Sequence, residues 1–395
     1  MKNQVLGILL ACVLTTGSNA QEKFRENVVG ETHVLFSKAL GTERTVDIYV
    51  PPGYETSNDR YPVLYLLDGQ RFFTYAVSLQ STFQQFQFTP DFVIVGIQNT
   101  YPDRFNHFSD GREMFERFIV NELKSYVDDH FRSSGENLLF GWEYGGGLAF
   151  DMLLSYPHAF DGYLLASPFP IAESVNRLDS LSDPEKTLFF GVSPDEHTVT
   201  IGVKKLDSLL LKDPPHGLKW TYLPLPQEEH RSTGYPVLYH GLLNYFQYYR
   251  ELEVNNLLKF LEAGGLDFAQ AYAKERSRKF GFPEELSLWS RFTIIRSAMR
   301  ANDFARFQQF LEGVGGQYFI RELVDNRSYA ASDVANFYER HNAHEMAVEV
   351  YQLLLEKYPN SESLLLRMGK ALQQLGREEA DEYLERAVHL QDNQN

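Results

Sequence analysis

Strand-like apolar runs alternate with helix-like segments between about residues 30 and 250, and this alternation restricts the fold more than any other feature. The continuous apolar runs at 61–67 and 92–97 are typical of buried strands. Between residues 114 and 131, apolar side chains recur at the spacing of a helix that faces a core. Strands that alternate with helices predict an α/β fold, in which helices cover both faces of a mainly parallel sheet.

Shorter patterns extend this alternation through the same region. A helix is expected over 145–156, where three glycines are followed by a run of mostly apolar residues. Further strands are expected at 46–50, 137–140, 163–166, 187–191 and 220–225. All of these segments are expected to belong to the same layered sheet.

After about residue 250 the strand patterns stop, and the remaining chain is expected to be helical. The segment 257–280 has helical spacing apart from a break at Gly264-Gly265, and 286–323 is mostly helical. The segments 331–360 and 361–395 share a spacing of small and large residues that is typical of tetratricopeptide repeats. Its positions are Ala335, Tyr338, Ala347, Tyr351 and Leu354 in the first segment, and Gly369, Leu372, Ala380, Leu384 and Ala387 in the second.

Two such repeats are fewer than the three that a stable stack usually needs, so the upstream helices are expected to complete it. An array this short offers little concave surface. It is either a packed helical extension or a binding surface for a protein partner.

The first twenty residues have the pattern of a secretory signal peptide. Lys2 precedes an apolar stretch at 5–14, and small residues follow at Ser18 and Ala20. The stretch is too short to span a bilayer, which takes ~20 apolar residues. We therefore expect cleavage after Ala20 and a periplasmic or secreted protein with no membrane span. Acylation at Cys12, as in a lipoprotein, is the alternative.

Charge and cysteine content narrow the classes of function. The chain has 37 Lys and Arg against 53 Asp and Glu, a formal net charge of −16, and no basic run that would suit nucleic acid or an anionic membrane. Cys12 is the single cysteine, so the mature chain is expected to lack disulfides and a Cys nucleophile. The sequence contains no phosphate-binding glycine loop and no cluster of metal ligands, so it implies neither a cofactor nor a metal.

The segment 138–147 has the layout of a nucleophile elbow, which is an apolar strand, Gly-x-nucleophile-x-Gly, and then a helix. Gly141 and Gly145 are expected to let the strand turn sharply into the helix without Cβ clashes. Such a turn holds the central side chain at the top of the sheet and aims backbone N–H groups at the same place. Most such elbows carry Ser at the centre, and this one carries Glu143.

Several segments in the same order make the chain resemble the bacterial esterase family of α/β-hydrolases, which includes esterase D and the siderophore trilactone esterases. They are 61–70, 96–100, 118–123, the elbow, 160–163 with Ser167-Pro168, and Glu229-His230 followed by Gly241-Leu242. The resemblance covers roughly residues 30–250 and implies an α/β-hydrolase fold. The tail also resembles that of some members. We expect a signal peptide at 1–20, a hydrolase domain at 21–250, a helical extension at 251–330 and two tetratricopeptide-like repeats at 331–395.

The resemblance also implies catalytic positions. Glu143 takes the nucleophile position, and His230 takes the general-base position in the loop after the last strand. The acid that orients the imidazole would be either Asp195 or Glu196, just after the strand that ends at Gly191.

Other residues would hold the substrate, which the family implies to be a small ester-like molecule. The backbone N–H of Tyr144 and that of either Gly69 or Gln70 would donate to the oxyanion. Arg104 lies in a loop where the family places substrate-facing residues. Either substrate binding or simple loop structure explains it.

The elbow departs from the family at the decisive residue. A Ser hydroxyl attacks a carbonyl after losing its proton to His, whereas a Glu carboxylate has no such proton and its attack on an ester would give an anhydride. Glu143 could instead act as a nucleophile or base, leave His230 to activate water, or form an ion pair with His230 that only stabilises the site. Two functions follow: an exported carboxylic-ester hydrolase with Glu in place of Ser, or a degenerate pseudo-esterase that binds a ligand or protein through the cleft or the repeats.

Overall fold

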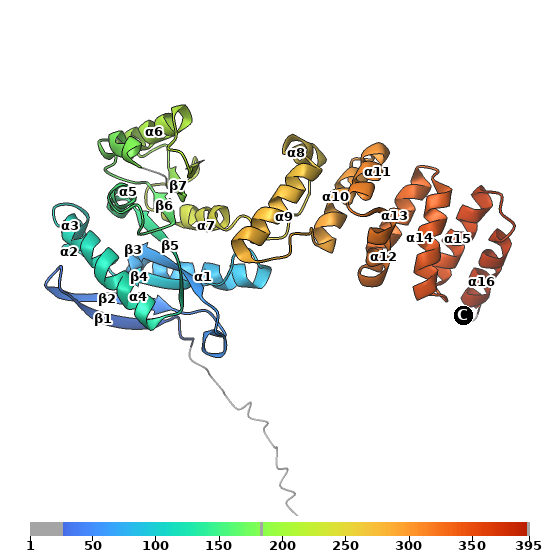
Figure 1. Cartoon of the computed structure of the whole chain (residues 1–395), viewed down its shortest axis with the longest axis horizontal. Coiled ribbons are helices and arrows are strands. Elements are labelled where there is room, and N and C mark those ends of the chain that lie inside the picture. The colour runs from blue at the N-terminus through green and yellow to red at the C-terminus, as the bar shows by residue number, and fades with distance from the viewer. Residues whose placement is uncertain (1–26, 182–184, 393–395) are drawn as a thin grey trace, which may run out of the picture.

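The computed structural model describes residues 27–181 and 185–392, which form a body built on a β-sheet and a helical arm (Figure 1). The expected signal peptide at 1–20, with Cys12, lies outside the described residues. In Figure 1 the arm leads away from the body, from α8 (Leu257–Glu262) to α16 (Ala380–Asp392). None of the helices in the described residues combines the length and apolar character needed to cross a membrane.

The body is organised around one sheet. Its strands in the described residues are β1 (Glu31–Ser37), β2 (Thr42–Tyr49), β3 (Tyr61–Leu67), β4 (Val93–Ile97), β5 (Ser133–Trp142), β6 (Gly162–Ala166), β7 (Lys186–Val192) and β8 (Leu218–Pro224). Their order is β1-β2-β4-β3-β5-β6-β7-β8. The β1–β2 and β2–β4 pairs are antiparallel and the other pairs are parallel. The expected α/β fold with a mainly parallel sheet is therefore confirmed.

Helices cover both faces of this sheet. The helices of the body are α1 (Gly69–Phe86), α2 (Asp103–Phe108), α3 (Arg112–Arg117), α4 (Lys124–His130), α5 (Tyr144–Ser155), α6 (His197–Lys212) and α7 (Gly234–Tyr245). Because successive residues of a strand point to opposite faces, Val63 and Tyr65 pack in the core with α3 to α6, while Leu64 and Leu66 pack with α1 and α7. Every residue of β3 is buried, as its apolar run predicted.

The single helix expected over 114–131 is interrupted in its hydrogen bonding. A π-helical segment, Phe118–Leu123, joins α3 to α4. Two short 3₁₀ helices, Tyr54–Thr56 and Ser174–Ser180, complete the helical elements of the body in the described residues.

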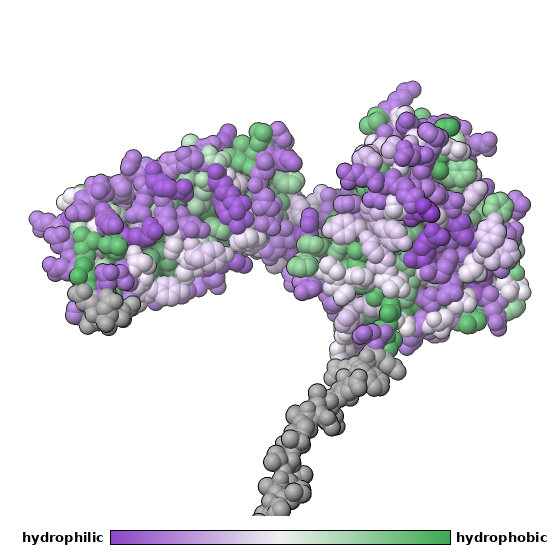
Figure 2. All heavy atoms as spheres, turned by 180° about the vertical axis from the view of Figure 1, so that it is seen from behind, coloured by the Kyte–Doolittle hydropathy of each residue, from purple (hydrophilic) through white to green (hydrophobic). Residues whose placement is uncertain are grey.

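The arm is all helical, as expected. Its helices are α8, α9 (Leu266–Phe280), α10 (Leu288–Arg300), α11 (Phe304–Gly313), α12 (Gly316–Asn326), α13 (Ser328–Arg340), α14 (His344–Lys357), α15 (Glu362–Gln374) and α16. The predicted break at Gly264-Gly265 separates α8 from α9, and both glycines have positive φ. The arm has its own apolar core, and hydrophilic residues cover much of its surface in Figure 2.

The last four helices occupy the two segments with repeat-like spacing. Ala335, Ala347 and Tyr351 are fully buried in the core of the arm. A Cβ on Gly369 would lie 2.7 Å from Cγ of Leu384, so α15 and α16 approach each other closely at this glycine. Their classification as tetratricopeptide-like repeats remains a prediction.

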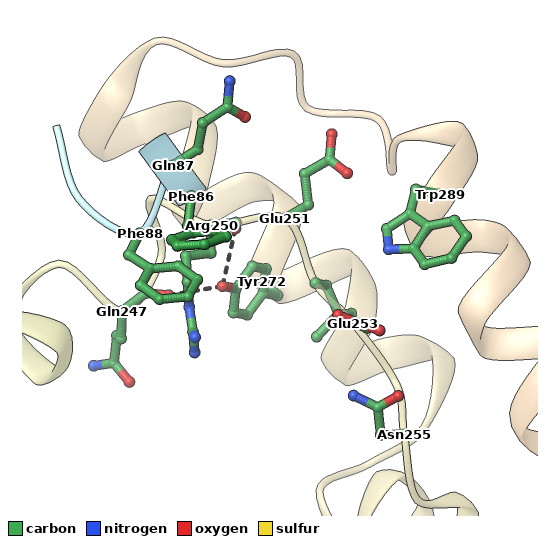
Figure 3. Close-up of a pocket in the computed structure, with 11 residues that line it drawn as sticks. Phe86, Gln87, Phe88, Gln247, Arg250, Glu251, Glu253, Asn255, Tyr272 and Trp289 are labelled. Atoms are coloured by element: carbon green, nitrogen blue, oxygen red, sulfur yellow. Dashed lines mark hydrogen bonds between the residues drawn. The ribbon is translucent and has the colours of Figure 1, made fainter. Parts of the chain in front are cut away.

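Hydrogen bonds to backbone carbonyls at the end of α7 and just after it hold the arm to the body. The Tyr272 hydroxyl of α9 donates to the carbonyls of Gln247 (2.7 Å) and Arg250 (3.1 Å), as Figure 3 shows. Nζ of Lys279 donates to the carbonyl of Tyr245 (2.9 Å), and Nε of Arg276 to that of Tyr249 (3.1 Å). These bonds satisfy carbonyls at a helix end that would otherwise need water, and they hold α9 against the body.

A buried carboxyl between α3 and α5 makes stability depend on pH. Burial raises the pKa of Glu116 from 4.5 to about 7; Arg112 opposes the rise and Asp151 adds to it. Between these pH values the native protein keeps a proton that the unfolded chain releases. The contribution of Glu116 to stability is therefore fully present below about pH 4.5 and is lost as the pH rises through about 7.

We expect Glu116→Gln to remove this dependence. Urea unfolding should be measured at about pH 5 and about pH 8. Between these pH values, the free energy of unfolding of the parent should fall by on the order of 1–2 kcal/mol more than that of the variant. Parallel pH dependence of the two proteins would contradict the assignment to Glu116.

Candidate active site

The centre of the site is the sharp turn between β5 and α5, which has Glu143 at its apex. Glu143 has φ 56° and ψ −121°, a backbone conformation that residues other than glycine adopt only under constraint. Its N–H donates to the carbonyl of Ala166 (3.0 Å), and its carbonyl accepts from the N–H of Phe169 (3.1 Å). Strand, turn and helix therefore have the geometry of a nucleophile elbow.

The glycines of the elbow differ in what they allow. A Cβ on Gly141 would lie 2.3 Å from the carbonyl oxygen of Gly145, and a Cβ on Gly147 would lie 2.3 Å from that of Phe169. A Cβ on Gly145 would meet only side-chain atoms of Leu67 and Phe108, at 3.4 Å and beyond. The expectation that Gly145 avoids a clash is wrong, because the close backbone approaches occur at Gly141 and Gly147.

The carboxylate of Glu143 lies between two basic side chains. Nη2 of Arg104 is 3.1 Å from its Oε2, and Nε2 of His230 is 3.6 Å from its Oε1. The side chains of Glu143 and Arg104 are 24% and 15% exposed, so water screens their contact only in part. The carboxylate therefore has a basic side chain on each side before any ligand binds.

On its other side, the imidazole of His230 contacts a buried acid. Nδ1 of His230 is hydrogen-bonded to Oε2 of Glu196, whose side chain is 4% exposed. Oε1 of Glu196 accepts from the Ser193 N–H (3.0 Å) and from the Ser167 hydroxyl (2.8 Å). Of the two acids that the sequence offered, Glu196 lies against the imidazole, whereas Asp195 is exposed and makes no contact with it.

The loop that carries His230 is held from two directions. The indole N–H of Trp142 donates to the carbonyl of His230 (3.0 Å), and so does the hydroxyl of Thr233 (3.0 Å). Thr233 and Ser167 are fully buried, and their hydroxyls are 2.7 Å apart. This pair of hydroxyls joins the acid to the loop of the imidazole.

Two helix N-termini meet at the elbow. Tyr144 is the first residue of α5, while Gly69 and Gln70 open α1. The first N–H groups of a helix have no acceptor within the helix, so these positions can donate to a ligand oxygen. The Gln70 side chain is occupied with Asn99: its Nε2 donates to the Asn99 carbonyl (2.6 Å), and its Oε1 accepts from the Asn99 N–H (2.9 Å).

Asp68 is a site residue that the sequence reasoning did not single out. Nε and Nη2 of Arg104 lie 2.8 and 2.9 Å from its two carboxylate oxygens, and its side chain is 1% exposed. Burial raises the pKa of Asp68 although Arg104 opposes the rise. Burial alone would lower the pKa of Arg104, but Asp68 and Glu143 together raise it. Arg104 thus bridges two carboxylates. In the sequence, the position of Asp68 directly after a buried strand was the feature that could have identified it as a site residue.

Within the described residues, no group of three or more His, Cys, Asp or Glu side chains is arranged to hold a metal ion.

Comparisons with known proteins bear on the fold of the body. Residues 37–192 match a protein family described as putative esterase. The uncharacterized protein YbbA of Bacillus subtilis (strain 168) is 27% identical over 134 residues, which cover 30% of this chain and 53% of that protein. The chain therefore spans about half the length of this curated relative.

Solved structures share the fold. An IroE-like serine hydrolase from Shewanella oneidensis is 22% identical with a TM-score of 0.52, over 73% of this chain and 99% of that one. An uncharacterised protein from Capnocytophaga ochracea DSM 7271 is 16% identical with a TM-score of 0.56, over 92% of this chain and 99% of that one. Residues 37–192 are thus similar to the putative esterase family, and the body that contains them has the α/β-hydrolase fold.

Proposed function

We propose that this protein is a pseudo-esterase, which binds an ester-like ligand at the elbow without hydrolysing it. The observation that carries the proposal is the position of the Glu143 carboxylate between Arg104 and His230. A general base serves a nucleophile by taking its proton, and an ionised carboxylate has none to give. Here the imidazole faces a negative charge where an esterase would have a hydroxyl.

The hydroxyl of Ser167 is not placed to replace the missing Ser. Ser167 lies at the end of β6, but its Oγ is fully buried and is bonded to Glu196 and Thr233 rather than to His230. Its orientation supports the acid, not attack on a bound ester. The proposal therefore assigns Ser167 a positioning role.

The remaining parts of the site suit a ligand with a polar carbonyl and an apolar group. The N–H of Tyr144 and those at the start of α1 are available donors for a carbonyl oxygen. The Tyr144 ring packs edge-on against Phe105 and Phe169, with centroids 5.6 and 5.5 Å away, and Phe105 is 45% exposed. These aromatic surfaces would cover the apolar part of the ligand.

The proposal includes export. The signal-peptide pattern at 1–20 and the absence of cysteine after Cys12 support a periplasmic or secreted protein. A mature N-terminus at Gln21 in protein recovered from the periplasm or medium would test this.

Hydrolysis of a nitrophenyl ester panel tests the proposal directly. Initial rates of the mature protein and of Glu143→Ala are both expected to equal the buffer rate. Turnover by the parent that disappears in Glu143→Ala would contradict the proposal and identify Glu143 as a catalytic group.

The contact between Glu196 and His230 favours a second candidate, a carboxylic-ester hydrolase in which His230 activates water. The same panel separates the two functions. Turnover that persists in Glu143→Ala and is lost in His230→Ala would establish this second candidate instead.

A further inference from the structure

A groove on the arm differs in charge from the rest of the chain. It lies between α10 and α13, has a volume of about 730 Å³, and is lined by Arg296, Arg300 and Arg340 with Asp333 as its one acidic residue. The whole chain carries a formal net charge of −16. Three arginines against one carboxylate in a chain of this charge mark a local site for an anion.

Two of these guanidinium groups have no ion-pair partner. Within the described residues, no ion pair within 4.0 Å includes Arg300 or Arg340, and the guanidinium carbon of Arg340 lies 5.1 Å from the centre of the Phe337 ring. Arg296 is engaged through Nη2 with Glu253 (3.4 Å), while its buried Nε has no hydrogen-bond partner. The groove therefore presents two exposed guanidinium groups that no carboxylate of the described residues neutralises.

The amide side chains in the groove add further donors. Oδ1 of Asn336 accepts from Tyr351 and Arg367, and Oδ1 of Asn302 lies 3.0 Å from Nε2 of His341. Because both amide oxygens already have protein partners, each residue has its NH₂ group left for a ligand. Donors that outnumber the acceptors of the groove favour a ligand that is rich in acceptor oxygens.

The polar residues of the groove recur at helical spacing on both α10 and α13. Arg296 and Arg300 are four residues apart on α10, and Asn336 and Arg340 are four apart on α13, so each pair lies on one helix face. Phe292 and Tyr329 also line the groove, and the Tyr329 side chain is 57% exposed. An extended segment lying between the helices would meet charged donors along its length and an aromatic surface beneath.

We propose that this groove binds an extended acidic segment of a partner protein, with Asp or Glu carboxylates on Arg300 and Arg340. Arg–carboxylate pairs are geometrically specific, and the aromatic residues offer contact area for the backbone and apolar side chains of a peptide. A nucleic acid is a poorer occupant, because the strong negative charge of the chain opposes a polyanion. The inference is independent of the function of the elbow.

A peptide-binding experiment on the full mature chain tests the proposal. The probe is a dye-labelled peptide of about ten residues, which spans roughly 30 Å when extended, with alternating Glu and Ser and an amidated C-terminus. The comparison peptide has Gln in place of Glu. Fluorescence anisotropy at about 150 mM salt should show that the Glu peptide binds at least about tenfold more tightly.

Matched variants locate the binding. The double variant Arg300→Glu with Arg340→Glu should bind the Glu peptide at least about tenfold more weakly than the parent does. Arg321→Glu with Arg377→Glu makes the same change of charge on the arm outside the groove and should leave the affinity within about twofold. Asp333→Asn should strengthen binding a few-fold, because it removes the one carboxylate of the groove. Thermal melts of all variants would verify that they are folded.

Three results would overturn the proposal. The Glu and Gln peptides could bind equally, the two double variants could lose affinity equally, or a single-stranded DNA oligonucleotide of the same length could bind more tightly than the Glu peptide. The second result would mean that the peptide binds through the overall charge of the arm and not in the groove. The third would mean that the groove is a nucleic-acid surface.

Discussion

Glu143→Ser is expected to give the protein an ester-hydrolase activity that the parent lacks. The elbow already has the required backbone conformation at residue 143, whose N–H is bonded to the end of β6 and whose carbonyl is bonded to the loop after it. Nε2 of His230 already faces that residue, and Nδ1 is held by Glu196. A Ser hydroxyl at this apex would therefore have a base, an orienting acid and donors at the helix N-termini.

The expected gain is roughly 10³-fold in the hydrolysis rate of a short nitrophenyl ester, since nucleophile and base act as a unit. Labelling by a fluorophosphonate probe, which reacts with activated Ser, is expected in the variant and not in the parent. Glu143→Gln keeps the size of the side chain but supplies no nucleophile, and it should remain inactive. Adding His230→Ala to Glu143→Ser should abolish the gain.

An inactive but folded Glu143→Ser variant would contradict the interpretation of the site. It would mean that the oxyanion donors or the imidazole no longer support acyl transfer, so that the loss of Ser is not the single defect. The absence of hydrolysis would then have more than one cause in the site.

Local patterns predicted much of the fold, and pairing across the sheet explains where they fell short. The run at 61–67 coincides with β3 because every residue of a strand covered on both faces is apolar. The strand expected at 137–140 extends over Ser133–Trp142. Its last residues, Gly141 and Trp142, pair with Leu165 and Ala166 of β6. This long-range pairing cannot be predicted from the local pattern of residues.

Site residues were predictable where the order of the family's motifs along the chain assigned a position. They were not predictable where only the three-dimensional packing brings the side chains together. Glu143 and His230 lie together, as the resemblance implied. Choosing between Asp195 and Glu196 required the turn after β7, which buries the second residue and exposes the first. The pair of Asp68 and Arg104 joins residues 36 positions apart, and only the packing of their loops brings them together.

The groove on the arm illustrates the same limit. Helical spacing places Arg296 and Arg300 on one face of α10, and Asn336 and Arg340 on one face of α13. Whether the two faces meet depends on how α10 and α13 pack, which is a property of the whole arm. The sequence therefore predicted a possible partner surface without its chemistry.

Gly141→Ala is expected to destabilise the body strongly, whereas Gly145→Ala in the same turn is not. At Gly141 the added methyl group would lie 2.3 Å from the carbonyl oxygen and 2.5 Å from the carbonyl carbon of Gly145. These are backbone atoms, so no rotamer change relieves the clash, and the elbow itself must move. At Gly145 the methyl group would be 3.4 Å from Cβ of Leu67, an ordinary contact.

We expect Gly141→Ala to lower the free energy of unfolding by about 3 kcal/mol or more, which corresponds to roughly 6–12 °C in melting temperature. Gly145→Ala should stay within about 1 kcal/mol of the parent, because Ala in a helix lowers the entropy of the unfolded chain. Thermal melts of the two variants beside the parent measure both effects. Equal melting temperatures for the two variants would mean that the turn at Glu143 relaxes without cost. In that case the constrained backbone that presents residue 143 to His230 would not be a fixed feature of the site.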